Sequence, residues 1–270
     1  MKTGANKRYQ VGGFTRPDAM ALVGTTLLLG GFVWLGIVAA GERRRTFVCA
    51  HRMKMLGQAF AEFAKDHKHT LPPAVFDDGQ NNTSWDREIA VYRKSEFGKQ
   101  NSPGKQKALE VEVAPAFKCP SDEEPRGGAM PRSYSMPMYD INTSGWPPDE
   151  NCLGGVGLYL DAKRLDKARK AMPAESSDYV PAIKLSVVPA PADTAWFMER
   201  ISIQNALWAT RFACVVSIKE QFDAKTFEPL DFHGDKMNYL LLDGHVELLA
   251  RAQSAGFIGT GSLWTIWPVD

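Results

Sequence analysis

Hydrophobic residues concentrate near the start of this chain. The run from Ala19 to Gly41 contains no charged residue, and its length of about 23 residues is enough to cross the hydrocarbon core of a bilayer as a helix. A short polar leader with Lys2, Lys7 and Arg8 precedes this run. The pattern predicts a membrane anchor, followed after Gly41 by one sizeable soluble domain.

A helical period continues beyond the apolar run. Met53, Leu56, Phe60 and Phe63 recur at spacings of three and four residues, which places them on one face of an amphipathic helix. Together the two patterns predict one helix over residues 18–67, about 75 Å long at 1.5 Å per residue. A break near Gly41, which would separate a membrane helix from a core helix, is the alternative.

The remaining sequence divides into two regions. Residues 71–182 are rich in Gly, Pro, Asn, Ser and charge, which predicts a loop-rich region with a short helix over 161–172. Strand patterns strengthen over residues 183–270. The clearest is a hairpin in which Asp243-Gly244 joins two apolar runs, a turn expected to need positive φ at both residues. The expected fold class is α+β, a long N-terminal helix packed on a C-terminal antiparallel sheet.

Three interpretations of the apolar run are open. It could be a cleaved secretory signal with Val38-Ala39-Ala40 as the cleavage site, although its apolar core is longer than usual for such signals. It could be an uncleaved signal anchor. In the third interpretation, processing takes place ahead of the run, after Gly13.

The third arrangement resembles the bacterial type IV pilin and type II secretion pseudopilin family. The residues that carry the resemblance are Gly13, Phe14, Thr15 and the acidic Asp18, followed by the long apolar helix. The resemblance implies cleavage after Gly13 by prepilin peptidase, methylation of the new N-terminal Phe14, and a role for Asp18 in assembly. The chain departs from the family pattern at Arg16-Pro17, and it has Asp where Glu is usual.

The carboxylate of Asp18 also has a local interpretation. Thr15 followed three residues later by Asp18 is close to a capping box, and Pro17 is tolerated in a first helical turn. In the family, the acid is held to neutralise the N-terminal amine of a neighbouring subunit, since an unpaired charge at the edge of the hydrocarbon is costly. The two roles are compatible.

Further motifs resemble a subgroup of pilin-like proteins. They are the Cys-Pro-Ser-Asp turn over 119–122, the Ser-Tyr-Ser-Met strand over 133–136, and an element in which His233-Gly234 precedes the hairpin of Asp243, Gly244 and His245. A tight turn at Pro120 and a strand whose Tyr134 packs inward are expected. The expected organisation is a leader over 1–13, an assembly helix over 14–41, an amphipathic helix over 42–70, a variable region over 71–182 and a sheet region over 183–270.

The resemblance implies a structural subunit of a filament or of a type II secretion-like system. Expected partners are prepilin peptidase, other pilin-like subunits and the cytoplasmic membrane, which the chain would cross once with its domain outside the cytoplasm. The alternative is a membrane-anchored exported module that binds a carbohydrate or peptide and does not assemble; Trp85 and Trp146 are candidates for such a surface. The net charge of +1 gives no case for nucleic acid.

The cysteines and histidines carry little sign of chemistry. None of the four cysteines belongs to a C-x-x-C pair, which argues against a zinc ribbon or a thioredoxin-like site. Because Cys49 and Cys119 both lie in segments that the resemblance marks as structural, they are the candidate disulfide, with buried free thiols as the equal alternative. His233, Asp235, Asp243 and His245 could bind a metal or form an enzyme site, but the hairpin explains them more simply. We therefore expect no catalytic residue, metal or cofactor.

Overall fold

The computed structural model describes residues 16–80, 82–93, 112–139, 155–171, 182–200, 202, 204–210, 213–215, 233–250 and 253. The chain forms two compact units, Met1–Arg44 and Arg45–Asp270. Gly13 and Phe14, the residues of the predicted processing site, lie outside the described residues, as do Trp146 and Cys152.

The long N-terminal helix is confirmed. α1 extends without interruption over Arg16–Asp66, so the predicted alternative of a break near Gly41 is wrong. Pro17 lies in its first turn, where a missing N–H costs nothing. The large apolar side chains between Met20 and Val38 are exposed within their unit. This helix is, in the described part of the chain, the one element long and apolar enough to cross a membrane.

The part of α1 that belongs to the second unit buries its predicted stripe. Cys49, Met53, Leu56, Phe60 and Phe63 are all buried, at successive spacings of four and three residues. Phe60 lies at the centre of an aromatic group, with ring centroids 4.5 Å from Phe197 and 5.7 Å from Trp85. Burying such large rings supplies much of the apolar free energy that fixes this end of the helix.

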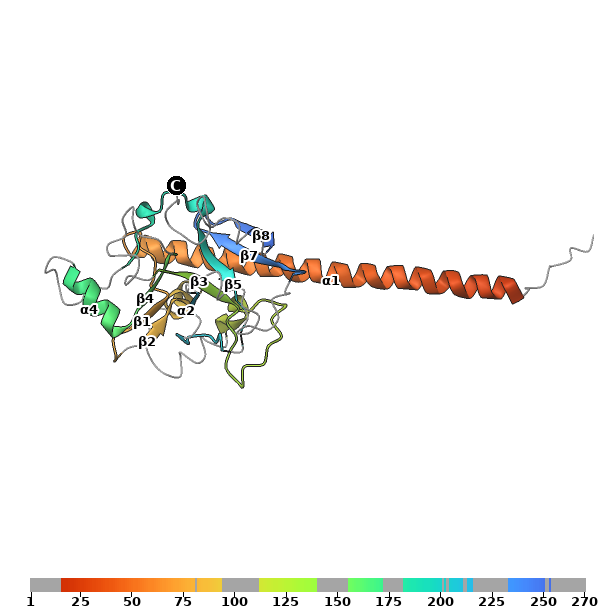
Figure 1. The fold of residues 1–270 in the computed structure, drawn as a ribbon, viewed down its shortest axis with the longest axis horizontal. Coiled ribbons are helices and arrows are strands. Elements are labelled where there is room, and N and C mark those ends of the chain that lie inside the picture. Colours follow the sequence, from red (N-terminus) through yellow and green to blue (C-terminus); the bar gives the residue numbers. More distant parts are fainter. Residues whose placement is uncertain are drawn as a thin grey trace, which may run out of the picture. The chain divides into compact units, whose positions relative to one another are not determined.

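The second unit contains a sheet and short helices (Figure 1). Its helices are α2 (Trp85–Ala90), α4 (Ala162–Ala171), the 3₁₀ turns at Val91–Arg93, Leu185–Val187 and Pro191–Asp193, and a helical segment over 112–117. Its strands are β1 (Val75–Asp77), β2 (Asn82–Ser84), β3 (Tyr134–Tyr139), β4 (Gly157–Leu160), β5 (Ala195–Glu199), β6 (Cys214–Val215), β7 (Lys236–Leu241) and β8 (Val246–Ala250). The described strands follow the order β2-β1-β4-β3-β5-β7-β8, and β6 pairs with β3.

The fold class is α+β, and β5, β7 and β8, from residues 183–270, pair antiparallel as expected. The described sheet as a whole is not antiparallel. β3 pairs in parallel with β4 and β6, and β1 pairs in parallel with β4, so the sheet is mixed.

Strands β1 to β4 come from residues 71–182, where a loop-rich region was expected. Of these, β3 was predicted from the Ser-Tyr-Ser-Met segment, and Tyr134 is buried as that prediction requires. β3 and β4 are buried over almost their whole length, so the period-two alternation that marks a half-exposed strand is absent. β1 and β2 have three residues each, too few to show a period. The apolar pattern over 183–188 also predicts a strand, but this segment holds the 3₁₀ turn Leu185–Val187 instead.

The C-terminal hairpin is confirmed, with a different turn. β7 and β8 pair antiparallel, with Leu240 opposite Val246. Positive φ occurs at Gly244 (93°) but not at Asp243, and the Gly244 N–H donates to the Leu241 carbonyl at 2.9 Å. This is the three-residue loop in which a turn is followed by one left-handed residue, instead of a two-residue turn with both residues left-handed.

Candidate metal centre

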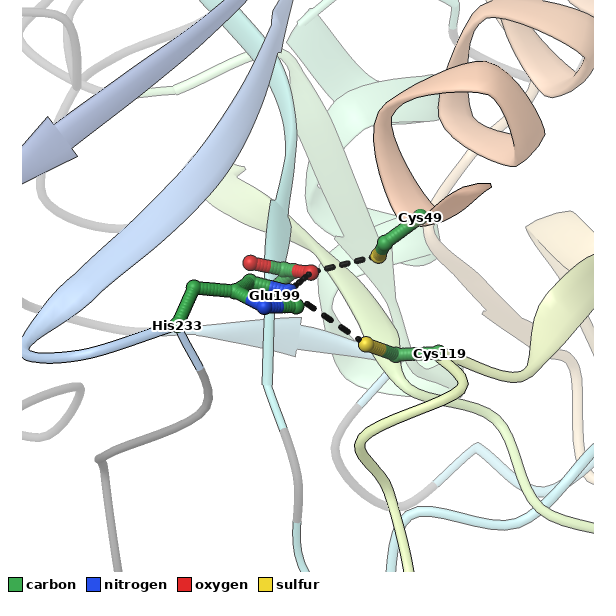
Figure 2. A group of neighbouring side chains, drawn as sticks. All are labelled: Cys49, Cys119, Glu199 and His233. Atoms are coloured by element: carbon green, nitrogen blue, oxygen red, sulfur yellow. Dashed lines mark hydrogen bonds and ion pairs between the residues drawn. The ribbon is translucent and has the colours of Figure 1, made fainter. Parts of the chain in front are cut away.

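Four side chains from distant parts of the second unit meet in its interior. They are Cys49, Cys119, Glu199 and His233, and Figure 2 shows their functional groups pointing toward one another. The two Sγ atoms, one carboxylate oxygen and one imidazole nitrogen all lie within 4.8 Å of one another. All four residues are buried. Because a buried charge is costly unless it is paired and hydrogen-bonded, the charges and protons of these four side chains must compensate one another.

The two cysteines come from α1 and from the turn of the Cys-Pro-Ser-Asp motif. Cys49 stands one helical turn before Met53 on the buried face of α1. Cys119 is held by its backbone, because its N–H donates to Ser133 Oγ at 2.8 Å, and that hydroxyl donates to Asp122 Oδ2 at 2.5 Å. Asp122 in turn forms a bidentate ion pair with Arg126. The motif residues therefore serve to place the Cys119 thiol.

Strand register places Glu199 and His233. Glu199 is the last residue of β5 and lies opposite Tyr134 of β3, so the two side chains share one face of the sheet. The Asn238 N–H of β7 donates to Glu199 Oε2 at 2.6 Å. His233 lies three residues before β7, and Gly234 and Asp235 follow it with positive φ. That left-handed bend turns the chain immediately after the imidazole.

The contacts within the group are short. Cys49 Sγ donates to Glu199 Oε1 at 2.5 Å, and His233 Nε2 lies 3.0 Å from the same oxygen. Cys119 Sγ lies 3.6 Å from His233 Nε2. The same nitrogen thus faces both the carboxylate and a sulfur, and one imidazole edge serves two partners.

A second set of contacts orients these groups from behind. Thr46 Oγ1 lies 2.9 Å from His233 Nδ1, the nitrogen that points away from the group. Tyr134 Oη lies 3.2 Å from Cys49 Sγ, and the Asn238 amide donates to Glu199 Oε1 at 3.2 Å. Each of these contacts fixes the rotamer of His233, Cys49 or Glu199. The functional group of that side chain is thereby held facing the other three residues of the group.

The pKa shifts follow from burial and from the close charges. Burial opposes ionisation of Glu199, but the hydrogen bond and charge of His233 outweigh it and hold the pKa of the carboxyl below its ordinary value. Burial also opposes protonation of His233, yet its contacts with Cys119 and Glu199 raise its pKa to about 10. Burial raises the pKa of Cys49, whereas the hydrogen bond from Cys49 lowers that of Cys119. Without a metal, Glu199 and His233 form a buried ion pair beside the two cysteine side chains.

The arrangement does not suit nucleophilic catalysis. In a Cys-His-acid triad, the nucleophile and the acid bind opposite imidazole nitrogens, so that the acid orients the ring. Here Cys119 and Glu199 both face Nε2, and Nδ1 faces Thr46. The side chains of His233 and Glu199 are 0% exposed, which leaves a substrate no access. Two sulfurs, one nitrogen and one oxygen around a common point instead form a ligand set for a transition metal.

The predicted site residues separate into two groups. Cys49 and Cys119 are brought together, as their predicted pairing requires, but both have free thiols, which was the alternative expectation. His233 joins them and Glu199, whereas His245 contacts Asp243 and Glu247 in the exposed hairpin. The first interpretation of these two histidines, as parts of one structural hairpin, therefore holds only for His245.

Two other expectations need correction or stay open. Trp85, considered for a carbohydrate surface, is fully buried, and its Nε1–H donates to the Ala213 carbonyl at 3.0 Å. Asp18 lies in the first turn of α1, and its assembly role stays a prediction.

Sequence reasoning missed Glu199 and the position of Cys49. Cys49 lies four residues before Met53, so extending the apolar stripe by one turn would have placed its thiol inside the domain. Glu199 ends a strand whose preceding residues are all apolar, and a charge in that position signals a buried partner. No local spacing connects the two, because the four residues of the group come from segments far apart in the chain.

The hairpin histidine gives a pH prediction. Its slight burial disfavours the charge, but hydrogen bonds to Asp243 and Glu247 outweigh this and raise the pKa of His245, while His245 lowers that of Asp243. The raised pKa of His245 stabilises the folded domain fully below about pH 6.5, and the lowered pKa of Asp243 stabilises it fully above about pH 3.9. The pair therefore contributes most to the free energy of unfolding between these two pH values. At 40% and 38% exposure, screening reduces this to a few tenths of a kcal/mol.

NMR titration of His245 in the full chain tests this prediction. We expect an imidazole pKa above 6.5 that falls toward its ordinary value in Asp243→Asn. A His245 pKa that is the same in both proteins would show that the pair does not form.

No protein-family model matches the chain, no curated protein matches it significantly, and no solved structure does either.

Proposed function

We propose that this chain is a pilin-like structural subunit of a bacterial envelope filament or of a type II secretion-like system. The observation that carries the proposal is the character of α1. Its first part exposes a continuous apolar surface and its second part, from Cys49, buries a regular stripe in a folded domain. A pilin-like subunit requires both properties in one helix, a membrane and assembly segment that continues into the domain core.

The Asp18 carboxylate fits the same role. Asp18 would follow Phe14 as the fifth residue of the processed chain, within the first turn of α1. A carboxylate there can pair with the new N-terminal amine of a neighbouring subunit, and the pairing lowers the cost of both charges beside the hydrocarbon. Prepilin peptidase, other pilin-like subunits and the cytoplasmic membrane are the partners this proposal entails, with the domain outside the cytoplasm.

The experiment is N-terminal peptide and intact-mass analysis of the full chain from membranes of its native host. We expect a mature chain that begins at methylated Phe14. Replacement of Gly13 by a larger residue is expected to leave the leader attached, because the peptidase cleaves after this glycine in the family that the motif resembles. A matched substitution of Gly12 controls for general effects on membrane insertion.

Two outcomes would contradict the proposal. A chain that begins at Met1 in the native membrane would favour the signal anchor and a binding module that does not assemble. A chain that begins just after Ala40 would show a secreted soluble domain.

A further inference from the structure

We propose that Cys49, Cys119, Glu199 and His233 bind one structural Zn²⁺ ion that fastens α1 to the sheet of the second unit. The inference rests on the geometry of that unit alone and is independent of the membrane role proposed above. It assigns a function to a buried group that the anchor, the helix stripe and the hairpin do not require.

The ligand atoms already converge. With bonds of about 2.0 to 2.3 Å, neighbouring ligands of a tetrahedral zinc stand about 3.3 to 3.8 Å apart. Cys119 Sγ and His233 Nε2 are 3.6 Å apart, and His233 Nε2 and Glu199 Oε1 are 3.0 Å apart. Cys49 Sγ and Glu199 Oε1, at 2.5 Å, would have to separate by about 1 Å. All four atoms lie within 4.8 Å of one another, so small side-chain adjustments complete the coordination.

The donor types select the metal. Two thiolates are soft ligands that Ca²⁺ and Mg²⁺ do not favour, and a mixed sulfur and nitrogen tetrahedron is typical of zinc. Four protein ligands fill the coordination shell, and the site is buried. A closed, four-coordinate shell with no position for water is the pattern of a structural site, because a catalytic zinc keeps one position open.

The hydrogen bonds around the four ligands are compatible with a bound zinc ion. With Nε2 on the metal, His233 carries its proton on Nδ1 and donates it to Thr46 Oγ1, which fixes the ring orientation. Two thiolates, one carboxylate and Zn²⁺ leave a net charge of −1. Hydrogen-bond donors offset that charge. The Tyr134 hydroxyl can donate to Cys49 Sγ, and the backbone N–H and the side-chain amide of Asn238 both donate to Glu199. Binding displaces the two thiol protons and any proton on Nε2 to solvent, with no change in oxidation state.

The proposed ion also accounts for reduced cysteines. In an oxidising compartment, two thiols this close would be candidates for oxidation to a disulfide. Coordination keeps both sulfurs as thiolates bound to a redox-inactive ion, and it connects residue 49 of α1 with strand and loop residues as far away as residue 233. A Cys49–Cys119 disulfide is therefore the competing state, and the two states exclude each other.

The test is metal analysis of the full chain, purified in mild detergent under reducing conditions without a metal-affinity step. We expect one zinc per chain by elemental mass spectrometry. Exchange with Co²⁺ is expected to give the visible bands of a tetrahedral ion and a thiolate-to-cobalt charge-transfer band. Cys119→Ser and His233→Gln are expected to lose zinc. The matched controls Cys214→Ser, at a buried cysteine of β6 outside the group, and His245→Gln are expected to retain it.

Each other outcome overturns the proposal. A wild-type chain without metal, whether its cysteines are free or joined in a disulfide by non-reducing peptide mapping, shows that these residues do not form a zinc site. Retention of zinc in both Cys119→Ser and His233→Gln places the ion elsewhere. A different metal at the same residues overturns the assignment of zinc. Because the wild-type stoichiometry and cobalt spectrum need no variant, a variant that fails to fold does not leave the question open.

Discussion

Arg132→Met is expected to lower the free energy of unfolding of the domain by about 3 to 5 kcal/mol. Arg132 Nη1 lies 2.7 Å from Asp86 Oδ1, and both side chains are 0% exposed. The substitution keeps the apolar volume of the side chain but leaves the Asp86 carboxylate buried without its cation. An isolated buried charge costs far more than the pair, which accounts for the size of the expected loss. The measurement is denaturant unfolding of the full chain in mild detergent, followed by tryptophan fluorescence.

A surface ion pair supplies the control. Lys170 and Asp166 are in contact at 2.6 Å with 75% and 61% of their side chains exposed, so Lys170→Met is expected to change stability by less than about 1 kcal/mol. Asp86→Asn in the Arg132→Met background removes the stranded charge and is expected to restore part of the loss. The single variant Asp86→Asn completes the cycle. If the double variant instead loses the sum of the Arg132→Met and Asp86→Asn losses, the residues are not coupled and the pair is not formed.

This ion pair adds a physical reason for the Ser-Tyr-Ser-Met motif, beyond the strand with an inward Tyr134 that the sequence predicts. The strand of the Ser-Tyr-Ser-Met segment follows Arg132, which also donates from Nε to Asn205 Oδ1 at 2.7 Å. Ser133 links the strand to the Cys-Pro-Ser-Asp turn through Asp122. Tyr134 contacts the Cys49 thiol. Three consecutive residues thus hold a buried ion pair, the turn of Cys119 and one metal-ligand candidate.

The sequence predicted the elements whose signals are local. The apolar run and the stripe from Met53 to Phe63 predicted α1, because a helix places residues three and four apart on one face. Asp243-Gly244 predicted the hairpin between β7 and β8, since its two strands are adjacent in the chain. The predicted turn type was wrong, because the turn that forms has only Gly244 in the left-handed region.

The parallel pairings and the metal-ligand group could not be predicted in this way. β3 pairs in parallel with β4 and β6, and each pairing joins segments separated by intervening chain with no turn signal to fix the register. The same applies to the ligand set. Zinc sites that are recognisable from sequence carry their ligands in closely spaced pairs, whereas here each ligand comes from a different element and is positioned by the packing of α1 on the sheet.

Removal of zinc is expected to produce the second large loss of stability, and it tests the structural role of the ion. An ion that binds the folded state stabilises it by about 4 kcal/mol when its free concentration is a thousandfold above its dissociation constant. For a domain of this size, each kcal/mol corresponds to about 2 to 4 °C in Tm, so a strong chelator is expected to lower Tm by about 8 to 16 °C. The measurement is thermal unfolding of the full chain by circular dichroism under reducing conditions, with and without chelator.

The controls separate zinc at this group from nonspecific effects of the chelator. Restoring Zn²⁺ is expected to restore Tm, whereas Mg²⁺ is not, because thiolates bind hard cations poorly. Glu199→Gln is expected to reduce the chelator response, since it replaces an anionic ligand with a neutral one, and His245→Gln is expected to leave the response unchanged. An equal Tm with and without chelator in a chain shown to contain zinc would mean that the ion does not stabilise the contact between α1 and the sheet. The buried ion pair of Glu199 and His233, with its hydrogen bonds from Asn238, would then be sufficient to hold this part of the fold.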